Sequence, residues 1–101
     1  IDVAVCVVGA PFAARYGGEE FVAILPETSK EEGVIVAERI RAAIAEREFE
    51  SEGKSLKSIT MSAGVATLSE SDKEPADFIG RADKALYAAK ESGRNRVVTA
   101  D

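Results

Sequence analysis

Two short, largely apolar runs lie in the first quarter of the chain, and the first of them is rich in β-branched residues. Residues 1–8 form the first run, which a Gly-Ala-Pro sequence at 9–11 interrupts. Residues 21–25 form the second run, and Pro26 closes it. Continuous apolar runs of this length, bounded by glycine and proline, are typical of β-strands. The pattern therefore predicts two strands, the first of which ends at Val8.

A hairpin signal precedes the second run. Residues 12–16 are a short strand candidate, and Gly17 and Gly18 separate them from the apolar residues that follow. Glycine reaches the positive φ values that tight turns require. The two glycines therefore predict the turn of a β-hairpin.

A helix is expected to begin at Thr28 and Ser29. Each of these residues has a glutamate three positions later, which is the spacing of a capping box. The pattern fades near Phe49, and a polar loop follows at 50–54. The apolar residues at helical spacing predict the buried face of this helix: Val36, Ile40 and Ile44.

The second half of the chain predicts a strand, a helix and a short closing strand. Residues 56–68 are rich in Ile, Thr and Val, and Gly64 among them indicates a β-bulge or a close backbone neighbour. Pro75 suits the first turn of a helix, and Gly93 suits its C-terminal end. The closing strand is expected at 97–98. The apolar stripe predicted for this helix is Phe78, Ala82, Ala85, Leu86 and Ala89.

The order of these elements is strand, hairpin, helix, strand, helix and strand. It predicts one α/β domain over residues 1–101, built as an α+β sandwich. The expected core is a central, mostly antiparallel sheet that is flanked by helices.

Composition narrows the chemistry open to this domain. The chain has no histidine and one cysteine, which excludes a Ser-His or Cys-His nucleophile, a histidine-ligated metal and an internal disulfide. A lone cysteine fits a reducing, cytoplasmic compartment. Carboxylates remain, and together with Mg²⁺ they commonly handle nucleotide phosphates. The net charge of −5 argues against a nucleic-acid partner, and no apolar run suits a membrane span.

Four segments resemble, in order, the motifs of the GGDEF family of diguanylate cyclases. They are Gly-Gly-Glu-Glu-Phe at 17–21, Ala-Glu-Arg-Ile-Arg at 37–41, the strand at 59–66, and residues 82–90 with Gly-Arg-Asn at 93–95. The resemblance implies a nucleotidyl-cyclase or polymerase-palm-like fold. It also implies an enzyme that condenses two GTP into cyclic di-GMP and releases pyrophosphate, with Mg²⁺ or Mn²⁺ as cofactor.

The Gly-Gly-Glu-Glu-Phe signature contains the main candidate site. Gly17 and Gly18 have no Cβ atoms, so a nucleotide can lie against their backbone. Glu19 and Glu20 carry the hard oxygens that Mg²⁺ selects. The resemblance implies that both are catalytic metal ligands and that Glu19 is a base. Adjacent strand residues point to opposite faces, which favours Glu19 unless the turn distorts the strand. The alternative is an ordinary hairpin turn followed by solubilising charge.

Three basic residues are further candidates. Lys90 and Arg94 are four residues apart, so a helix would project them on one side. The resemblance implies that they bind the terminal phosphates of GTP, although cations at a helix C-terminus also complement its dipole. Arg39 matches a position where some family members bind product for feedback. A solvated surface arginine is the alternative for Arg39.

The chain departs from the family pattern ahead of the signature. The family's Arg-x-x-Asp product-inhibition motif is replaced here by Val-Gly-Ala-Pro at 8–11. The family's Asp-x-Asp and Asn-Asp pairs, which supply a metal carboxylate and read guanine, do not occur in these residues. We therefore expect a domain that is incomplete on its N-terminal side, with a segment missing between Val8 and Gly9. These residues alone are expected to be inactive.

The leading hypothesis is a cytoplasmic diguanylate cyclase domain of a bacterial signalling protein. Each domain would hold one GTP, so two domains must meet as a homodimer. The resemblance also implies an N-terminal sensor domain in the parent protein. A degenerate GGDEF module that binds GTP or cyclic di-GMP without catalysis is the alternative. A third hypothesis is a related nucleotidyl cyclase or polymerase palm that also accepts ATP.

Overall fold

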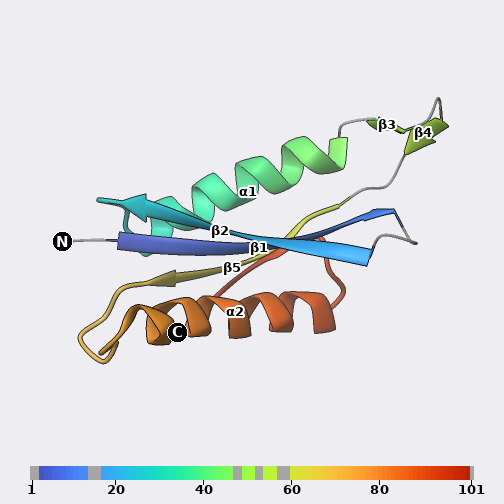
Figure 1. Cartoon of the computed structure of the whole chain (residues 1–101). Helices are drawn as coiled ribbons and strands as arrows, with labels where there is room; N and C mark the ends of the chain where they lie inside the picture. Colours follow the sequence, from blue (N-terminus) through green and yellow to red (C-terminus); the bar gives the residue numbers. More distant parts are fainter. Residues whose placement is uncertain (1–2, 14–16, 47–48, 52–53, 57–59, 101) are drawn as a thin grey trace.

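The computed structural model describes residues 3–13, 17–46, 49–51, 54–56 and 60–100, with side chains for 20–46 and 60–100. Its helices are α1 (Lys30–Glu46) and α2 (Pro75–Glu91). Its strands are β1 (Val3–Ala13), β2 (Gly17–Pro26), β3 (Phe49–Ser51), β4 (Lys54–Leu56), β5 (Ser62–Thr67) and β6 (Val97–Thr99). Four strands form one sheet in the order β2-β1-β5-β6, and α1 and α2 lie on its two sides (Figure 1). The predicted α/β class is confirmed.

The four-stranded sheet is mixed. β1 is antiparallel to both of its neighbours, β2 and β5, whereas β5 and β6 are parallel. Parallel strands need a crossover connection, and α2 provides it between β5 and β6. The short strands β3 and β4 form a separate antiparallel pair that the sequence pattern did not predict.

β1 is longer than the apolar pattern predicted. It runs through Val8 and Gly9 to Ala13, so the predicted end at Val8 is wrong. Val8 and Gly9 face consecutive residues of β2 on one side and of β5 on the other. Pairing with two neighbours carries the strand through residues of low strand propensity. Among the described pairs, Pro11 is matched with β2 but not with β5, and strands tolerate proline where one side is unpaired. The segment predicted to be missing after Val8 is not tested by this pairing and stays a prediction.

The two signature glycines begin β2 instead of forming the turn. Gly17 is paired with Ala13 and Gly18 with Pro11, and the register shifts between these pairs. The prediction that both glycines make the turn is wrong, because the ladder extends to Ala13 and leaves the connection to residues 14–16. Those three residues, predicted as the end of a strand, lie outside the described part of the chain.

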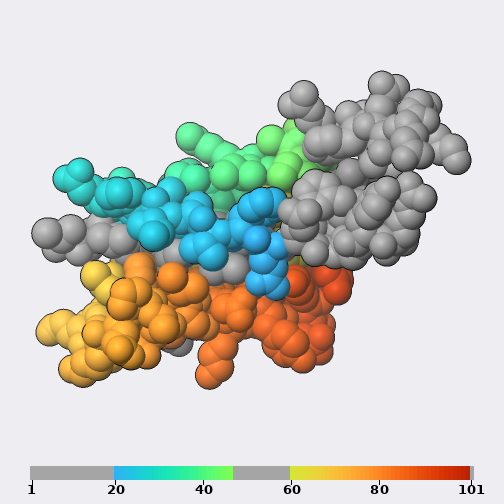
Figure 2. All heavy atoms as spheres, in the orientation of Figure 1, coloured from blue at the N-terminus to red at the C-terminus, as the bar shows by residue number. Residues whose placement is uncertain are grey.

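β2 is an edge strand of the sheet. Its apolar side chains are about half exposed or more: Phe21 is 53% exposed, Val22 51% and Ile24 61%. Figure 2 shows the part of β2 from residue 20 onward on the visible surface between α1 and α2. The apolar run therefore predicted a strand but did not indicate whether the side chains of that strand are buried.

β5 is the buried centre of the domain and divides the core in two. Ala63 and Val65 form one cluster with Met61 and with Ala37 of α1. The other cluster joins Ala66 to three residues of α2: Phe78, Ala82 and Leu86. Because successive strand residues point to opposite faces, the two clusters place the two helices on opposite sides of the sheet.

The predicted capping box of α1 is present at Ser29. Ser29 N donates to Glu32 Oε1 at 2.9 Å, and Glu32 N donates to Ser29 Oγ at 3.2 Å. These reciprocal bonds satisfy backbone donors that the first turn of a helix otherwise leaves unpaired. Thr28 instead donates its hydroxyl to Pro26 O at 2.9 Å, which leaves Ser29 as the cap.

α1 buries a different face from the one predicted. Its buried residues are Gly33 and Ala37, while Val36 is 39% exposed and Ile40 is 46% exposed. The prediction is wrong for Val36 and Ile40, and Ile44 is partly buried against the core. Small residues let a helix approach a sheet closely, and this close approach turns the larger side chains outward.

α2 buries the residues that the sequence pattern predicted. Pro75 lies in its first turn, and Gly93 follows its end with a φ of 127°. Both predictions are therefore confirmed. The buried residues of α2 are Phe78, Ala82, Ala85, Leu86 and Ala89.

Gly64 has a close backbone neighbour and no bulge. The register of β5 against β1 is regular across Gly64. A Cβ atom on Gly64 would lie 2.1 Å from Ala82 O and 2.3 Å from Leu86 N, so α2 packs directly on this glycine. The single strand predicted at 56–68 is wrong, because β4 ends at Leu56 and β5 begins at Ser62. Residues 57–59 lie outside the described residues.

Candidate functional site

The candidate site lies at one end of the four-stranded sheet. Glu20 of β2 is paired with Gly9 of β1, and Gly9 is paired with Ser62 of β5. Beyond Ser62, Asn95 N donates to Ser62 Oγ at 3.1 Å. Neighbouring strands are about 4.8 Å apart, so Glu20 and Ser62 are separated by about 10 Å. These pairings and this hydrogen bond place β2, which begins with the signature, at the same end of the sheet as the turn at 93–96.

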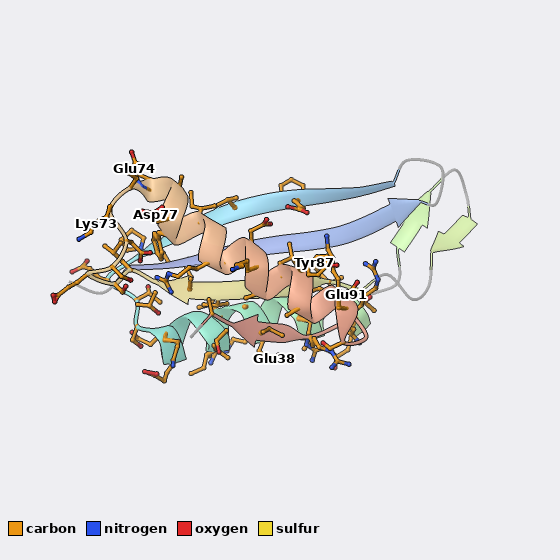
Figure 3. The ribbon with its side chains drawn as sticks, turned by 90° about the horizontal axis from the view of Figure 1, so that it is seen from below. Glu38, Lys73, Glu74, Asp77, Tyr87 and Glu91 are labelled. Atoms are coloured by element: carbon orange, nitrogen blue, oxygen red, sulfur yellow. The ribbon has the colours of Figure 1, made fainter. Side chains whose placement is uncertain are left out.

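α2 brings a lysine to the signature. Lys90 lies in the last turn of α2, at the end marked by Glu91 in Figure 3. Its Nζ is 3.3 Å from Glu20 Oε2, and the two side chains are 27% and 52% exposed. Exposed ion pairs contribute little to stability. Lys90 or Glu20 can therefore leave this contact and bind a ligand group instead. The structure thus joins two of the predicted site residues.

The remaining signature residues are placed by their backbone. Gly17, Gly18 and Glu19 begin β2, opposite the last residues of β1. From Gly18 to Pro26 the register of the ladder is regular, so no described bulge brings Glu19 and Glu20 to one face of β2. The side chain of Glu19 lies outside the described side chains, and its predicted role stays a prediction.

Arg94 lies beyond α2 and not on it. The helix ends at Glu91, and Arg94 N donates back to Ala89 O at 2.9 Å. This bond and the left-handed Gly93 form a Schellman-type helix end. The prediction that Lys90 and Arg94 share one side of a helix is therefore wrong, because the backbone turns at Gly93 before it reaches Arg94.

A metal could use the carboxylate of Glu20. Mg²⁺ prefers such hard oxygen ligands, and Glu20 is at an accessible strand edge beside a cation. Among the residues whose side chains are described, no three or more His, Cys, Asp or Glu side chains converge on one point. Of the two predicted metal ligands, only Glu20 has a described side chain, and the predicted metal site stays a prediction.

Sequence reasoning assigned no role to Arg41, Asn95 or Ser62. Arg41 Nη1 donates to Asn95 Oδ1 at 2.7 Å, across 54 positions of the chain. The only signal for this contact was that Arg41 and Asn95 fall within segments that resemble family motifs. Arg39, on the same helix, is exposed, and its predicted feedback role stays a prediction.

In the described part of the chain, neither helix has the length and apolarity that crossing a membrane requires.

A family model described as "Diguanylate cyclase, GGDEF domain" matches residues 3–96. Diguanylate cyclase A of Treponema denticola is 44% identical over 92 residues, which cover 91% of this chain and 24% of that protein. Diguanylate cyclase DgcP of Pseudomonas aeruginosa is 50% identical over 91 residues, which cover 90% of this chain and 13% of that protein. The chain thus spans less than a quarter of the length of these relatives.

Solved structures show the same fold. The active GGEEF domain of a diguanylate cyclase from Vibrio cholerae matches with a TM-score of 0.84 at 26% identity. The match covers 99% of this chain and 83% of that one.

Proposed function

The chain belongs to the GGDEF-domain family of diguanylate cyclases, and on that premise we propose that it catalyses the condensation of two GTP into cyclic di-GMP with release of pyrophosphate. The contact between Glu20 and Lys90 carries the proposal, because it brings the acidic signature to the basic end of α2. A metal-bound triphosphate needs both: carboxylates bind the metal, and cations bind the phosphates. The Vibrio cholerae domain, described as active, has the same Gly-Gly-Glu-Glu-Phe form of the signature.

Glu19 and Glu20 are the proposed ligands of Mg²⁺ or Mn²⁺. Bound there, the metal would neutralise charge on the reacting phosphate and lower the pKa of the attacking 3′-hydroxyl. Glu19 is the proposed base that accepts the proton of this hydroxyl. Gly17 and Gly18 leave room for the nucleotide beside the strand, since neither has a Cβ atom.

Lys90 and Arg94 are the proposed ligands of the terminal phosphates. Lys90 would exchange the Glu20 carboxylate for a phosphate oxygen when the nucleotide binds. This exchange costs little free energy because the pair is solvent-accessible. Arg94 would approach the phosphates from the turn after α2, and its guanidinium can bind two oxygens at once.

Two such domains are proposed to meet with their GTP molecules face to face, so that each nucleotide supplies the hydroxyl that attacks the other. A two-fold homodimer follows from this stoichiometry. We place the domain in the cytoplasm of a bacterial cell, behind a sensor domain of the parent protein.

A non-catalytic GGDEF module that binds GTP or cyclic di-GMP is the second candidate. One observation favours it: the residues of this chain lack the Asp-x-Asp pair that the family resemblance led us to expect ahead of the signature. If this holds for the parent protein, the domain would retain nucleotide binding without turnover.

Incubation of the purified parent protein with GTP and Mg²⁺ separates these functions. A diguanylate cyclase releases pyrophosphate and forms a cyclic dinucleotide. A binding module retains GTP or cyclic di-GMP but forms neither product, and this outcome would end the enzyme proposal. ATP should be a much poorer substrate than GTP. Equal use of the two nucleotides would instead point to another nucleotidyl cyclase.

A further inference from the structure

Three successive residues after α2 have backbone angles in the positive-φ region. The φ angles are 127° for Gly93, 62° for Arg94 and 49° for Asn95. Glycine reaches this region freely and asparagine tolerates it, but an arginine rarely adopts it. A residue in such a conformation persists only where the surrounding structure holds it there. The conformation of Arg94 therefore requires an explanation from its neighbours.

Contacts from three elements hold this segment. From α2, Ala89 O accepts a hydrogen bond from Arg94 N at 2.9 Å. From β5, Ser62 Oγ accepts a bond from Asn95 N at 3.1 Å, and Ser62 is only 3% exposed. From α1, Arg41 Nη1 donates to Asn95 Oδ1 at 2.7 Å. Two of the three contacts thus act on Asn95, directly after Arg94.

Arg41 is itself oriented by a second partner. Its Nε donates to Glu38 Oε1 at 2.6 Å, and its Nη2 forms an ion pair with the same oxygen. The side chain of Arg41 is 19% exposed, against 48% for Glu38. A guanidinium is planar, so fixing one edge on Glu38 also sets the direction in which the other nitrogens donate. Arg41 therefore reaches Asn95 as a pre-oriented group.

We propose that Arg41 is a positioning residue, which acts through Asn95 to hold Arg94 in the conformation that binds the phosphates of GTP. This inference rests on the proposed function, because Arg94 is a phosphate ligand only there. Without Arg41, the 93–95 segment can relax, and Arg94 spends less time in its binding conformation. The apparent Kd rises in inverse proportion to the population of that conformation. A fall of this population to about one fifth would weaken GTP binding about fivefold.

The test uses the full-length parent protein and two nucleotide probes in Mg²⁺. The first probe is 3′-deoxy-GTP, which keeps the triphosphate but lacks the attacking hydroxyl. The second is GMP, which lacks the terminal phosphates. Calorimetry should show that Arg41→Ala weakens binding of 3′-deoxy-GTP about fivefold and changes the Kd of GMP less than twofold.

Two substitutions of Asn95 make the test specific. Asn95→Asp keeps an acceptor for Arg41 and tolerates a positive φ, so it should bind both probes as the wild type does. Asn95→Gly keeps access to positive φ but removes Oδ1, so it should reproduce the loss seen in Arg41→Ala. Lys84→Ala, which removes an exposed charge on α2, is the control and should bind both probes normally.

The outcomes separate the two proposals. If Arg41→Ala and Asn95→Gly bind 3′-deoxy-GTP like the wild type, the positioning role is overturned and the proposed function stands. If either variant weakens both probes equally and also melts earlier, Arg41 has a structural role only. If the wild type itself does not bind 3′-deoxy-GTP, the proposed function fails, and the positioning role fails with it. Should Arg41→Ala not fold, Asn95→Gly still decides the question.

Discussion

The Nζ of Lys90 lies 3.3 Å from Oε2 of Glu20, although the two residues are 70 positions apart in the chain. Both side chains remain accessible to solvent. An accessible ion pair contributes about 0–1 kcal/mol, so its main consequence is geometric: the basic end of α2 is directed at the signature strand. A cation that only complements the dipole of its helix would need no acidic neighbour on another element.

Lys90→Ala should therefore affect nucleotide binding more than folding. The free energy of unfolding should fall by less than about 1 kcal/mol, because the lost pair is exposed. The Kd of GTP should rise about tenfold, since a charge-assisted hydrogen bond to phosphate is lost. Calorimetry and thermal melts of the parent protein measure the two effects. A loss of stability without a loss of affinity would favour the helix-dipole role.

Glu19→Gln should reduce turnover of GTP at least about tenfold and leave the fold intact. The substitution removes a negative charge but keeps the size of the side chain, so metal binding and proton transfer suffer while packing does not. Pyrophosphate release gives the rate, and circular dichroism checks the fold. Glu20→Gln is the matched variant at the adjacent position. Near-normal turnover in Glu19→Gln would contradict its assignment as ligand and base.

Gly64→Ala should destabilise the domain by at least about 2 kcal/mol, because overpacking forces neighbouring atoms apart. The added Cβ would meet the backbone of α2 at 2.1 Å, so the helix must move away from β5. Gly80→Ala is the matched control, since its Cβ would meet nothing within 4 Å. Alanine favours a helix, so this control should stabilise by up to about 1 kcal/mol. Denaturant unfolding measures the free energy of unfolding of both variants. Similar changes in the two would refute the close packing of α2 on Gly64.

A partly buried aspartate connects α2 to the loop that precedes it. Arg81 Nε donates to Asp72 Oδ1 at 3.0 Å, and Arg81 Nη2 donates to Asp72 Oδ2 at 2.6 Å. Arg81 Nη2 also donates to Thr67 O at 2.6 Å. The hydrogen bonds from Arg81 hold the pKa of Asp72 below its ordinary value of 3.8. The side chain of Asp72 is only 3% exposed, which limits access of water to this contact.

The depressed pKa sets the pH dependence of stability. Asp72 is ionised more readily in the folded chain than in the unfolded one, so its contribution is complete above about pH 5. It is lost as the pH falls through the folded pKa, below 3.8. Asp72→Asn should therefore melt at a lower temperature than the wild type at pH 7, and the difference should shrink below about pH 4. Melting curves from pH 7 to pH 3 measure this, and a difference that stays constant would contradict the assignment.

Local patterns predicted α2 and the start of α1 well. The stripe from Phe78 to Ala89, Pro75 at the beginning and Gly93 at the end all depend on residues within one or two turns of each other. The same holds for the Ser29–Glu32 capping box. Such features are set by backbone geometry and nearest neighbours, which the sequence displays directly.

The buried face of α1 could not be predicted in the same way. Val36 and Ile40 are more hydrophobic than Gly33 and Ala37, yet the smaller residues are buried. The choice depends on how closely α1 approaches β5, which is a property of two elements together. The length of β1 and the contact of Arg81 with Asp72 likewise depend on partners that lie elsewhere in the chain.

The amino-acid sequence alone determined the family of this protein, the start of α1 and both ends of α2, and it named the acids and cations that are candidates for the site. Only the tertiary structure decided that Lys90 meets Glu20, that Arg94 lies beyond the helix, and that Arg41 reaches Asn95. Periodicity and capping act between residues a few positions apart, whereas these contacts join residues that only the packing of both helices on one sheet brings together.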